Sequence, residues 1–385
     1  MHAELIAIGS ELVLGEIVDT NSAHIARALR SLGLEVERFS AIGDRADRIA
    51  ALVREAAGRS PVVITTGGLG PTVDDPTREA VARAFDRELE YRPELWAQIE
   101  ARFRKFGRTP TENNRAQAHI PAGARPVENP VGTAPAFIVE HPGGAVICLP
   151  GVPREMEHLL TQAILPYLRQ TFNLNGILKS KILRTVGLGE SAIDARIGDL
   201  ERLENPAVGL AAHAGQVDIR ITAKAASEAE ADALIAPVEA QVRAAFGDFI
   251  FAEGAQTLEE AVAQLLAARG LSVAVAEAAT DGRLNARLAV LPQAAQVYRG
   301  AIPAADGRPL EAEAGRARSE RGADFGLAAR VLRSPDQNRI ELALADGASA
   351  ETRVQGYGGP PAHLGQWAST AALNLLRLRL LKPDR

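Results

Sequence analysis

The chain of 385 residues carries a formal net charge of −5, and 46% of its residues are hydrophobic while 24% are charged. At about 150 residues per domain, this length suggests roughly two or three domains, and the composition is that of globular proteins. The negative charge argues against proteins that coat nucleic acid or anionic membranes. The single cysteine, Cys148, excludes an internal disulfide framework and a zinc site built on several cysteines, and it favours a reducing compartment.

The amino terminus and the hydropathy of the chain favour a cytoplasmic protein. Glu4 and Glu11 interrupt the first apolar run too early for a secretion signal. No apolar stretch reaches the roughly 18 residues that are needed to cross a bilayer. We therefore expect cytoplasmic localisation and no membrane partner.

Short apolar runs alternate with amphipathic segments at the start of the chain. The predicted elements are a strand at 5–8, a helix at 21–32, a strand at 34–39, a helix at 49–57, a strand at 61–65 and a helix at 76–85. This alternation predicts an α/β domain with a mainly parallel sheet between two layers of helices. Ligands of such sheets bind beyond the carboxyl ends of the strands.

The later part of the chain completes this domain and forms two more. The elements expected there are a helix rich in arginine and lysine at 91–115, a strand at 146–149, a helix at 153–168, a strand–helix–strand–helix unit at 179–250 and a closing helix at 365–381. Turn-forming residues after completed helices place the domain junctions. The predicted domains are 1–172, 173–253 and 254–385, the second a small α+β unit and the third again α/β.

The string TTGGLGPTVDDPT at 65–77 has the composition of an anion-binding loop. Gly67, Gly68 and Gly70 can adopt positive φ and bring backbone N–H groups close to a phosphate, and the following helix start adds free amides. Asp74 and Asp75 supply the hard oxygen ligands that Mg²⁺ prefers. Asp75 before Pro76 is also a good helix N-cap, and Asp74 could be a solvated loop residue, so both interpretations stay open.

Longer motifs around this loop resemble those of a known family. TTGGLGPTVDDPTREAVA closely resembles the signature of the molybdopterin-binding fold as carried by the competence/damage-inducible protein A (CinA) family. IAIGSELVLGEIVDTNSAHIARAL, TENNRAQAHIP, NPVGTAPAF and LPGVPREM follow the family's order. The resemblance implies an amino-terminal domain that hydrolyses ADP-ribose to AMP and ribose 5-phosphate with a divalent cation (Mg, Mn or Co), and a homodimer. A molybdopterin- or nucleotide-binding protein, or a stress-linked scaffold without turnover, is the alternative.

The resemblance also implies roles for individual residues. The acids that position the metal and water are Asp75, Asp44 and Glu11, and the metal ligands are Asp74 and Asp75. The diphosphate is expected at Gly67, Gly68, Gly70 and Thr72, with ribose or phosphate contacts from Asn21, Asn114 and Arg115, and a second wall that includes Thr133. Asn21 could instead be a helix N-cap, Arg115 a surface arginine, and Glu155 either a turn residue or a ligand.

The two later domains resemble the family without a clear site. TVGLGESAIDARI resembles the family's central KH-like domain, but acidic residues outnumber basic ones by eleven to eight between 179 and 250, so nucleic-acid binding is not expected. In the third domain the family's Glu-Ser-Cys-Thr-Gly-Gly string is replaced by Glu-Ala-Ala-Thr-Asp-Gly at 277–282, with Ala278 in place of the nucleophilic serine. Two further family segments are altered at 302–315 and 329–337. We therefore expect no deamidation of nicotinamide mononucleotide; Thr280 as a substitute nucleophile lacks a nearby base.

Overall fold

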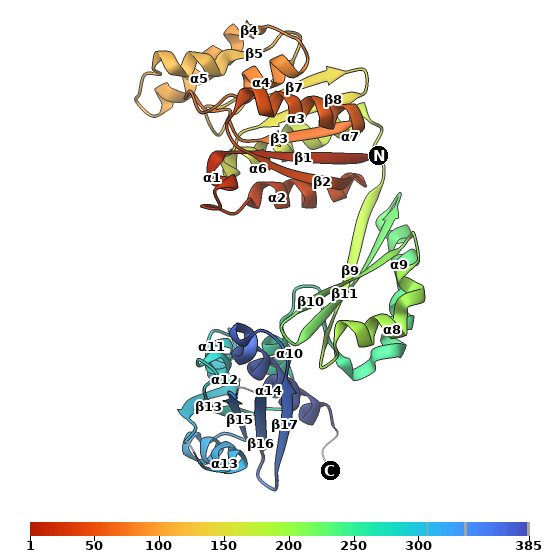
Figure 1. Ribbon diagram of the computed structural model, residues 1–385, viewed down its shortest axis with the longest axis vertical. Coiled ribbons are helices and arrows are strands. Elements are labelled where there is room, and N and C mark those ends of the chain that lie inside the picture. The colour runs from red at the N-terminus through yellow and green to blue at the C-terminus, as the bar shows by residue number, and fades with distance from the viewer. Residues whose placement is uncertain (306, 335–336, 383–385) are drawn as a thin grey trace. The chain divides into compact units, whose positions relative to one another are not determined.

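The structure is a computed structural model that describes residues 1–305, 307–334 and 337–382. The chain divides into two compact units (Figure 1). Unit 1 consists of Met1–Lys179 with Lys224–Ala231, and unit 2 of Ser180–Ala223 with Asp232–Arg385. Among the described residues, no helix combines the length and apolar composition that crossing a membrane requires.

Unit 1 is built around a six-stranded sheet with the strand order β2-β1-β3-β8-β7-β6. The strands are β1 (His2–Ile8), β2 (Glu35–Ile42), β3 (Val62–Thr66), β6 (Arg125–Val127), β7 (Ala136–His141) and β8 (Gly144–Leu149). The neighbours from β2 to β8 pair in parallel, and β7 pairs antiparallel with both β8 and β6. The predicted α/β class with a mainly parallel sheet is confirmed.

Helices cover both faces of this sheet (Figure 1). They are α1 (Ser10–Val13), α2 (Thr20–Leu29), α3 (Ala46–Arg59), α4 (Thr77–Ala84), α5 (Pro93–Lys105), α6 (Pro153–Leu159) and α7 (Leu165–Thr171), with 3₁₀ turns η1 (Arg30–Leu32) and η2 (Glu112–Ala118) and a π turn η3 (Leu160–Ile164). Successive residues of β3 point to opposite faces, so Val63 packs with α3, α4 and α5 while Ile64 packs with α2, α6 and α7. Two apolar layers therefore hold the strands, and the loops are left to meet at the carboxyl edge.

Two predictions for unit 1 are wrong. The basic helix expected at 91–115 is instead β4 (Leu89–Tyr91), α5 and η2, and β4 pairs with β5 (His119–Pro121). Helix α5 stops at Lys105 because Gly107 adopts a φ of +64° and Pro110 cannot continue the helical hydrogen bonding. Strands β6 and β7, where no strand was predicted, extend the parallel sheet by an antiparallel edge.

Cys148 lies in the middle of the sheet. It belongs to β8, beside Thr65 of β3 and Phe137 of β7 in the strand register. Its side chain is completely buried, and this burial raises the pKa of the thiol to about 12. The group is therefore a protonated core residue at neutral pH.

The remaining elements form a four-stranded sheet in the order β10-β11-β9-β12 and a five-stranded sheet in the order β14-β13-β15-β16-β17. The first set comprises β9 (Ile177–Val186), α8 (Glu190–Glu201), β10 (Ala207–His213), β11 (Gln216–Ala225), α9 (Glu228–Phe246), η4 (Gly247–Phe249) and β12 (Ile250–Glu253). The antiparallel hairpin β10–β11 stands where the sequence predicted one strand, and β12 was not predicted.

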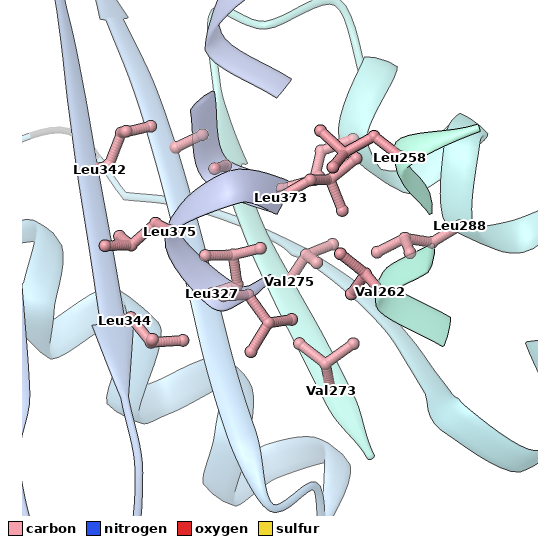
Figure 2. Close-up of a cluster of buried hydrophobic side chains, with 14 of the residues drawn as sticks. Leu258, Val262, Val273, Val275, Leu288, Leu327, Leu342, Leu344, Leu373 and Leu375 are labelled. Carbon is pink, nitrogen blue, oxygen red and sulfur yellow. The ribbon is translucent and has the colours of Figure 1, made fainter. Parts of the chain in front are cut away.

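The five-stranded sheet carries the last apolar core. Its elements are α10 (Leu258–Ala268), β13 (Val273–Ala278), α11 (Arg283–Ala289), α12 (Ala294–Val297), β14 (Tyr298–Pro303), α13 (Leu310–Arg321), β15 (Phe325–Leu332), β16 (Asn338–Ala345), β17 (Ala350–Tyr357), η5 (Pro361–His363) and α14 (Leu364–Leu381). Figure 2 shows Leu373 and Leu375 of α14 against Val275 of β13 and Leu327 of β15. The predicted closing helix is confirmed and packs on the sheet.

Candidate functional site

The loops that follow β1, β3 and β8 meet at the carboxyl edge of the parallel strands in unit 1. A Cβ added at Gly67 would lie 2.0 Å from the carbonyl oxygen of Ile8, and one added at Gly151 would lie 3.3 Å from the Cα of Gly67. Gly67 adopts a φ of +107°, so both its conformation and its close contact with β1 exclude a side chain. The predicted convergence of loops at this edge is observed.

The glycine loop is fastened to the start of α4 by its carbonyl oxygens. The Thr77 hydroxyl donates to the carbonyl of Gly67 at 2.8 Å. The guanidinium of Arg78 donates to the carbonyl of Leu69 at 2.7 Å and to that of Gly70 at 2.6 Å. The carbonyl groups of the loop are therefore turned toward the helix and are satisfied there.

Three backbone N–H groups of the same loop are left without acceptors among the described residues. Within the described part of the chain, the N–H groups of residues 68–70 donate no hydrogen bond. Unpaired backbone donors are tolerated only where water or a ligand completes them. Together with the amino end of α4, these N–H groups make a cradle suited to an anion.

Arg78 adds a positive charge beneath this cradle, and the sequence analysis missed it. Its side chain is 6% exposed and forms no ion pair with a described carboxylate. Burial lowers the pKa of the guanidinium to about 10, so the group stays charged at neutral pH. The one indication in the sequence is a basic residue at the second position of a helix, where a cation opposes the helix dipole unless an anion lies nearby.

Asp75 lies at the rim of the loop and does not cap α4. Its Oδ2 accepts hydrogen bonds from the backbone N–H of Thr72 at 2.9 Å and from the Thr72 hydroxyl at 2.6 Å. Helix α4 begins at Thr77 without a side-chain cap, so the N-cap interpretation of Asp75 is wrong. These bonds use one carboxylate oxygen of Asp75 and leave Oδ1 available, while Asp74 is exposed beside it.

The other two predicted acids lie at the loops after β1 and β2. Asp44 accepts a hydrogen bond from the backbone N–H of Ser10 at 2.8 Å, which ties the two loops together. The carboxylate of Glu11 is exposed and folds back against Gly9. Strand β1 lies between β2 and β3, so Asp44 and Asp75 belong to the loops on either side of it.

The carboxylates of this site could hold a divalent cation only together with a bound anionic substrate. Among the described residues, no group of three or more His, Cys, Asp or Glu side chains is arranged to hold a metal ion. Mg²⁺ in nucleotide sites keeps several waters and is held by one or two carboxylates together with substrate phosphates. The free Oδ1 of Asp75 and the exposed Asp74 match that donor set, so the cation would be shared between the protein and an anionic substrate.

Asn21 reaches into the same edge with one atom unused. Its Nδ2 donates to the Thr66 hydroxyl at 3.1 Å and to the carbonyl of Gly151 at 2.7 Å. Its Oδ1 is buried and has no hydrogen-bond partner in the described residues. The N-cap of α2 is Asp19, which accepts from the N–H of Ser22, so the N-cap interpretation of Asn21 is wrong. An acceptor oriented by two neighbours and left open suits a ligand hydroxyl.

Asn114 has a different role from the one expected. Its Oδ1 accepts from the N–H and the hydroxyl of Thr111 at 2.9 and 3.0 Å, which is a capping box for η2. Its Nδ2 donates to Gln117, whose own Nε2 donates to the carbonyl of Leu69 at 3.2 Å. Asn114 is buried, and its amide is occupied by protein contacts, so it positions the glycine loop rather than a ligand.

Arg115 lines a pocket that begins at Asp75. The pocket has a volume of about 470 Å³, and its lining includes Thr72, Asp75, Pro76, Leu89, Arg115 and His119. The guanidinium of Arg115 lies 5.2 Å from the ring centroid of Tyr91 and 5.9 Å from that of Trp96. Arg115 is therefore held in place by two rings and is more than a free surface charge.

The wall that contains Thr133 is shaped by Glu155. The Asn129 amide donates to Glu155 at 2.6 Å and to the carbonyl of Ala134 at 2.9 Å. A Cβ at Gly132 would lie 1.9 Å from the Glu155 carboxylate, so a side chain there would displace that carboxylate. Burial raises the pKa of the Glu155 carboxyl above its usual value. Glu155 thus fixes the fold of this loop, and Thr133 itself is half-buried on it.

In unit 2 the loop after β13 keeps an unusual backbone. Ala279 and Asp281 adopt φ values of +55° and +57°, in the region that favours glycine. The Thr280 hydroxyl donates to Glu277 at 2.6 Å, and Glu277 also accepts from the backbone N–H groups of Leu284 and Asn285 at the start of α11. Thr280 is 1% exposed. Within the altered segments at 302–315 and 329–337, residues 306, 335 and 336 lie outside the described residues.

Three family models match consecutive parts of the chain. A model described as "Probable molybdopterin binding domain" matches residues 4–170. One described as "Damage-inducible protein CinA KH domain" matches residues 180–252, and one described as "CinA C-terminal domain" matches residues 255–304.

Relatives that match parts of the chain carry related names. A "Putative competence-damage inducible protein" of Clostridium botulinum (strain Kyoto / Type A2) is 43% identical over 304 residues, which are 78% of this chain and 74% of that protein. A "CinA-like protein" of Prochlorococcus marinus (strain MIT 9313) is 42% identical over 300 residues, which are 78% of this chain and 70% of that protein. A crystal structure of the protein CinA from Thermoplasma acidophilum is 39% identical and has a TM-score of 0.40, covering 43% of this chain and 96% of that chain.

Proposed function

Since the chain belongs to the CinA family of competence/damage-inducible proteins, we propose that its amino-terminal domain hydrolyses a nucleoside diphosphate sugar, with ADP-ribose converted to AMP and ribose 5-phosphate. The observation that carries this proposal is the loop at 67–70. Its carbonyl oxygens are bound to α4, its N–H groups at 68–70 have no acceptor among the described residues, and the buried Arg78 lies beneath it.

The proposed binding mode places the diphosphate on the N–H groups of this loop. The charge of Arg78 is worth more there than in water because burial reduces its screening. The buried Oδ1 of Asn21, which has no partner among the described residues, would accept a hydrogen bond from a ribose hydroxyl. These groups recognise an anion that also carries hydroxyls, which is the chemistry of a nucleotide sugar.

In the proposed reaction, water attacks one phosphorus atom and the bridging phosphorus–oxygen bond breaks. The electron pair of that bond leaves with the second phosphate, and the proton of the water is released. Oδ1 of Asp75 would accept a hydrogen bond from the attacking water and orient it, because Thr72 already fixes Oδ2. A divalent cation held by Asp74, Asp75 and the substrate, when bound, would neutralise the diphosphate and lower the pKa of its water.

The test is to incubate the purified full chain with ADP-ribose and Mg²⁺, Mn²⁺ or Co²⁺, with excess chelator as the control. We expect AMP and ribose 5-phosphate to appear in equal amounts by chromatography with at least one cation, and no turnover with chelator. Absence of AMP with all three cations would overturn the enzymatic proposal and leave nucleotide or molybdopterin binding without turnover.

For the carboxyl-terminal domain we propose that the fold is kept without deamidase chemistry. Ala278 carries only a methyl group, and the neighbouring Thr280 hydroxyl is buried and donates to Glu277. The expected result is no release of ammonia from nicotinamide mononucleotide by the purified chain, measured by a coupled ammonia assay. Steady ammonia release above that of a heat-denatured sample would contradict this prediction.

A further inference from the structure

A pocket lies next to Asp75, at the rim of the glycine loop. The loop after β3 lines one side with Thr72, Asp75 and Pro76, and η2 lines the other with Glu112 and Arg115. Its volume of about 470 Å³ lies in the range of small-molecule sites. It therefore has room for a further group of a substrate whose diphosphate lies on the N–H groups of residues 68–70.

On the wall of this pocket formed by η2, the guanidinium of Arg115 packs against aromatic rings. The Arg115 guanidinium lies 5.2 Å from the centroid of Tyr91, and the His119 ring lies 5.3 Å from the same centroid. The His119 ring nitrogen Nδ1 lies 3.0 Å from the carbonyl oxygen of Arg115, which fixes the ring relative to η2. A guanidinium backed by aromatic rings presents a planar face on which another ring can stack.

This surface is mechanically connected to the phosphate cradle. Gln117, two residues after Arg115, donates from Nε2 to the carbonyl of Leu69 in the glycine loop. The capping box of Thr111 and Asn114 holds the start of the same 3₁₀ turn. The stacking surface and the cradle therefore keep a fixed spacing, as a site for one ligand with two joined groups requires.

The chemistry of the lining favours a base over a sugar phosphate. Ala116 and the 40%-exposed Leu89 offer apolar surface, and the exposed carboxylate of Glu112 can accept hydrogen bonds from an amino group. A second phosphate would meet this carboxylate as a like charge, whereas adenine presents a flat face and an exocyclic amine. Resting on the proposed function, we propose that this pocket binds the adenine of the substrate, which stacks on the guanidinium of Arg115.

The test measures binding of AMP and of ribose 5-phosphate separately, by calorimetry, to the full chain and to Arg115→Ala. We expect the substitution to weaken AMP binding by about tenfold or more, since base stacking is typically lost on truncation to alanine, and to leave ribose 5-phosphate binding unchanged. Arg115→Lys keeps the charge without the planar face and is expected to lose most of the same affinity. Arg104→Ala removes an exposed arginine of α5 and serves as the matched control, with a thermal melt of each variant as the check on folding.

Four outcomes would overturn the inference: no AMP binding by the unaltered chain, unchanged AMP affinity in Arg115→Ala, an equal loss for AMP and ribose 5-phosphate, or full affinity in Arg115→Lys, which would make Arg115 a phosphate contact. Because these measurements need no turnover, they are independent of the proposed hydrolysis. If the unaltered chain does not cleave ADP-ribose but Arg115→Ala binds AMP more weakly, the adenine pocket stands and the proposed reaction is refuted. If the unaltered chain cleaves ADP-ribose but Arg115→Ala binds AMP with unchanged affinity, the reaction stands and the adenine pocket is refuted.

Discussion

Replacing Asp75 by asparagine is expected to lower the rate of AMP formation from ADP-ribose by about 10³-fold, in the range lost when a group that positions a reacting proton is removed. Asparagine keeps an oxygen that can accept from Thr72, so the loop conformation should survive. What disappears is the negative charge and the second carboxylate oxygen, which would act on the cation and the water. The measurement is kcat with ADP-ribose at saturating cation, together with a thermal melt that should shift little.

The matched control for Asp75→Asn is Asp86→Asn. Asp86 follows the end of α4, and its side chain is 91% exposed, in a long contact of 3.7 Å with Arg54. The same chemical change there removes a carboxylate that lies away from the glycine loop, and an exposed pair contributes little to stability. Unchanged kcat in Asp75→Asn would contradict the assigned role, and an equal loss in both variants would indicate a general charge effect.

Replacing Arg78 by methionine is expected to destabilise the glycine loop by about 2–3 kcal/mol, since a buried polar group left without its partner costs about 1–3 kcal/mol. The carbonyl of Gly70 loses the guanidinium donor, while the carbonyl of Leu69 keeps Gln117. A chain with several domains has no single free energy of unfolding, so hydrogen exchange resolved to peptides from residues 62–84 is the appropriate measurement. We also expect weaker AMP binding, because the charge beneath the cradle is removed.

Arg83→Met is the control for Arg78→Met. Arg83 lies on the exposed side of the same helix and pairs with Glu79 one turn earlier. Removing its guanidinium is therefore expected to change hydrogen-exchange protection by less than about 0.5 kcal/mol. Arg78→Lys keeps the charge but replaces a two-pronged donor by a compact ammonium, and it should fall between the two. If Arg78→Met and Arg83→Met lose hydrogen-exchange protection equally, Arg78 does not stabilise the glycine loop as predicted.

The parallel sheet and the glycine loop could be predicted because their signals are local. Residues 62–66 are a continuous apolar and β-branched run, buried throughout in β3, and the glycines follow at once. The break in the basic segment at 91–115 was also present locally, in Gly107 and Pro110, but the repeating pattern of aromatic and basic residues hid it. Strand β7 carries a comparable local signal in its buried apolar run at 136–139, but its antiparallel pairing with β8 across a short turn was not predicted.

The roles of individual site residues depended on tertiary contacts. The same sequence pattern allowed Asn21 to cap a helix or to face a ligand. Its hydrogen bond to Gly151, 130 residues away, and the Asp19 cap exclude the first, and the ligand contact stays a prediction. Asn114 looked like a ligand contact in its motif, yet its amide caps η2 and holds Gln117. Arg78 became informative only when its burial was known, because an exposed arginine at that position would be ordinary.

The inaccessible thiol of Cys148 makes the chain convenient for site-directed spectroscopy. A protonated sulfhydryl inside the sheet neither ionises nor meets a reagent at neutral pH, so maleimides have no native target in this sequence. Val73 is 99% exposed and stands between Thr72 and Asp74. Through Val73→Cys, a single fluorophore can be attached at the rim of the glycine loop while the native cysteine stays in place, which gives a direct optical reporter of nucleotide arrival.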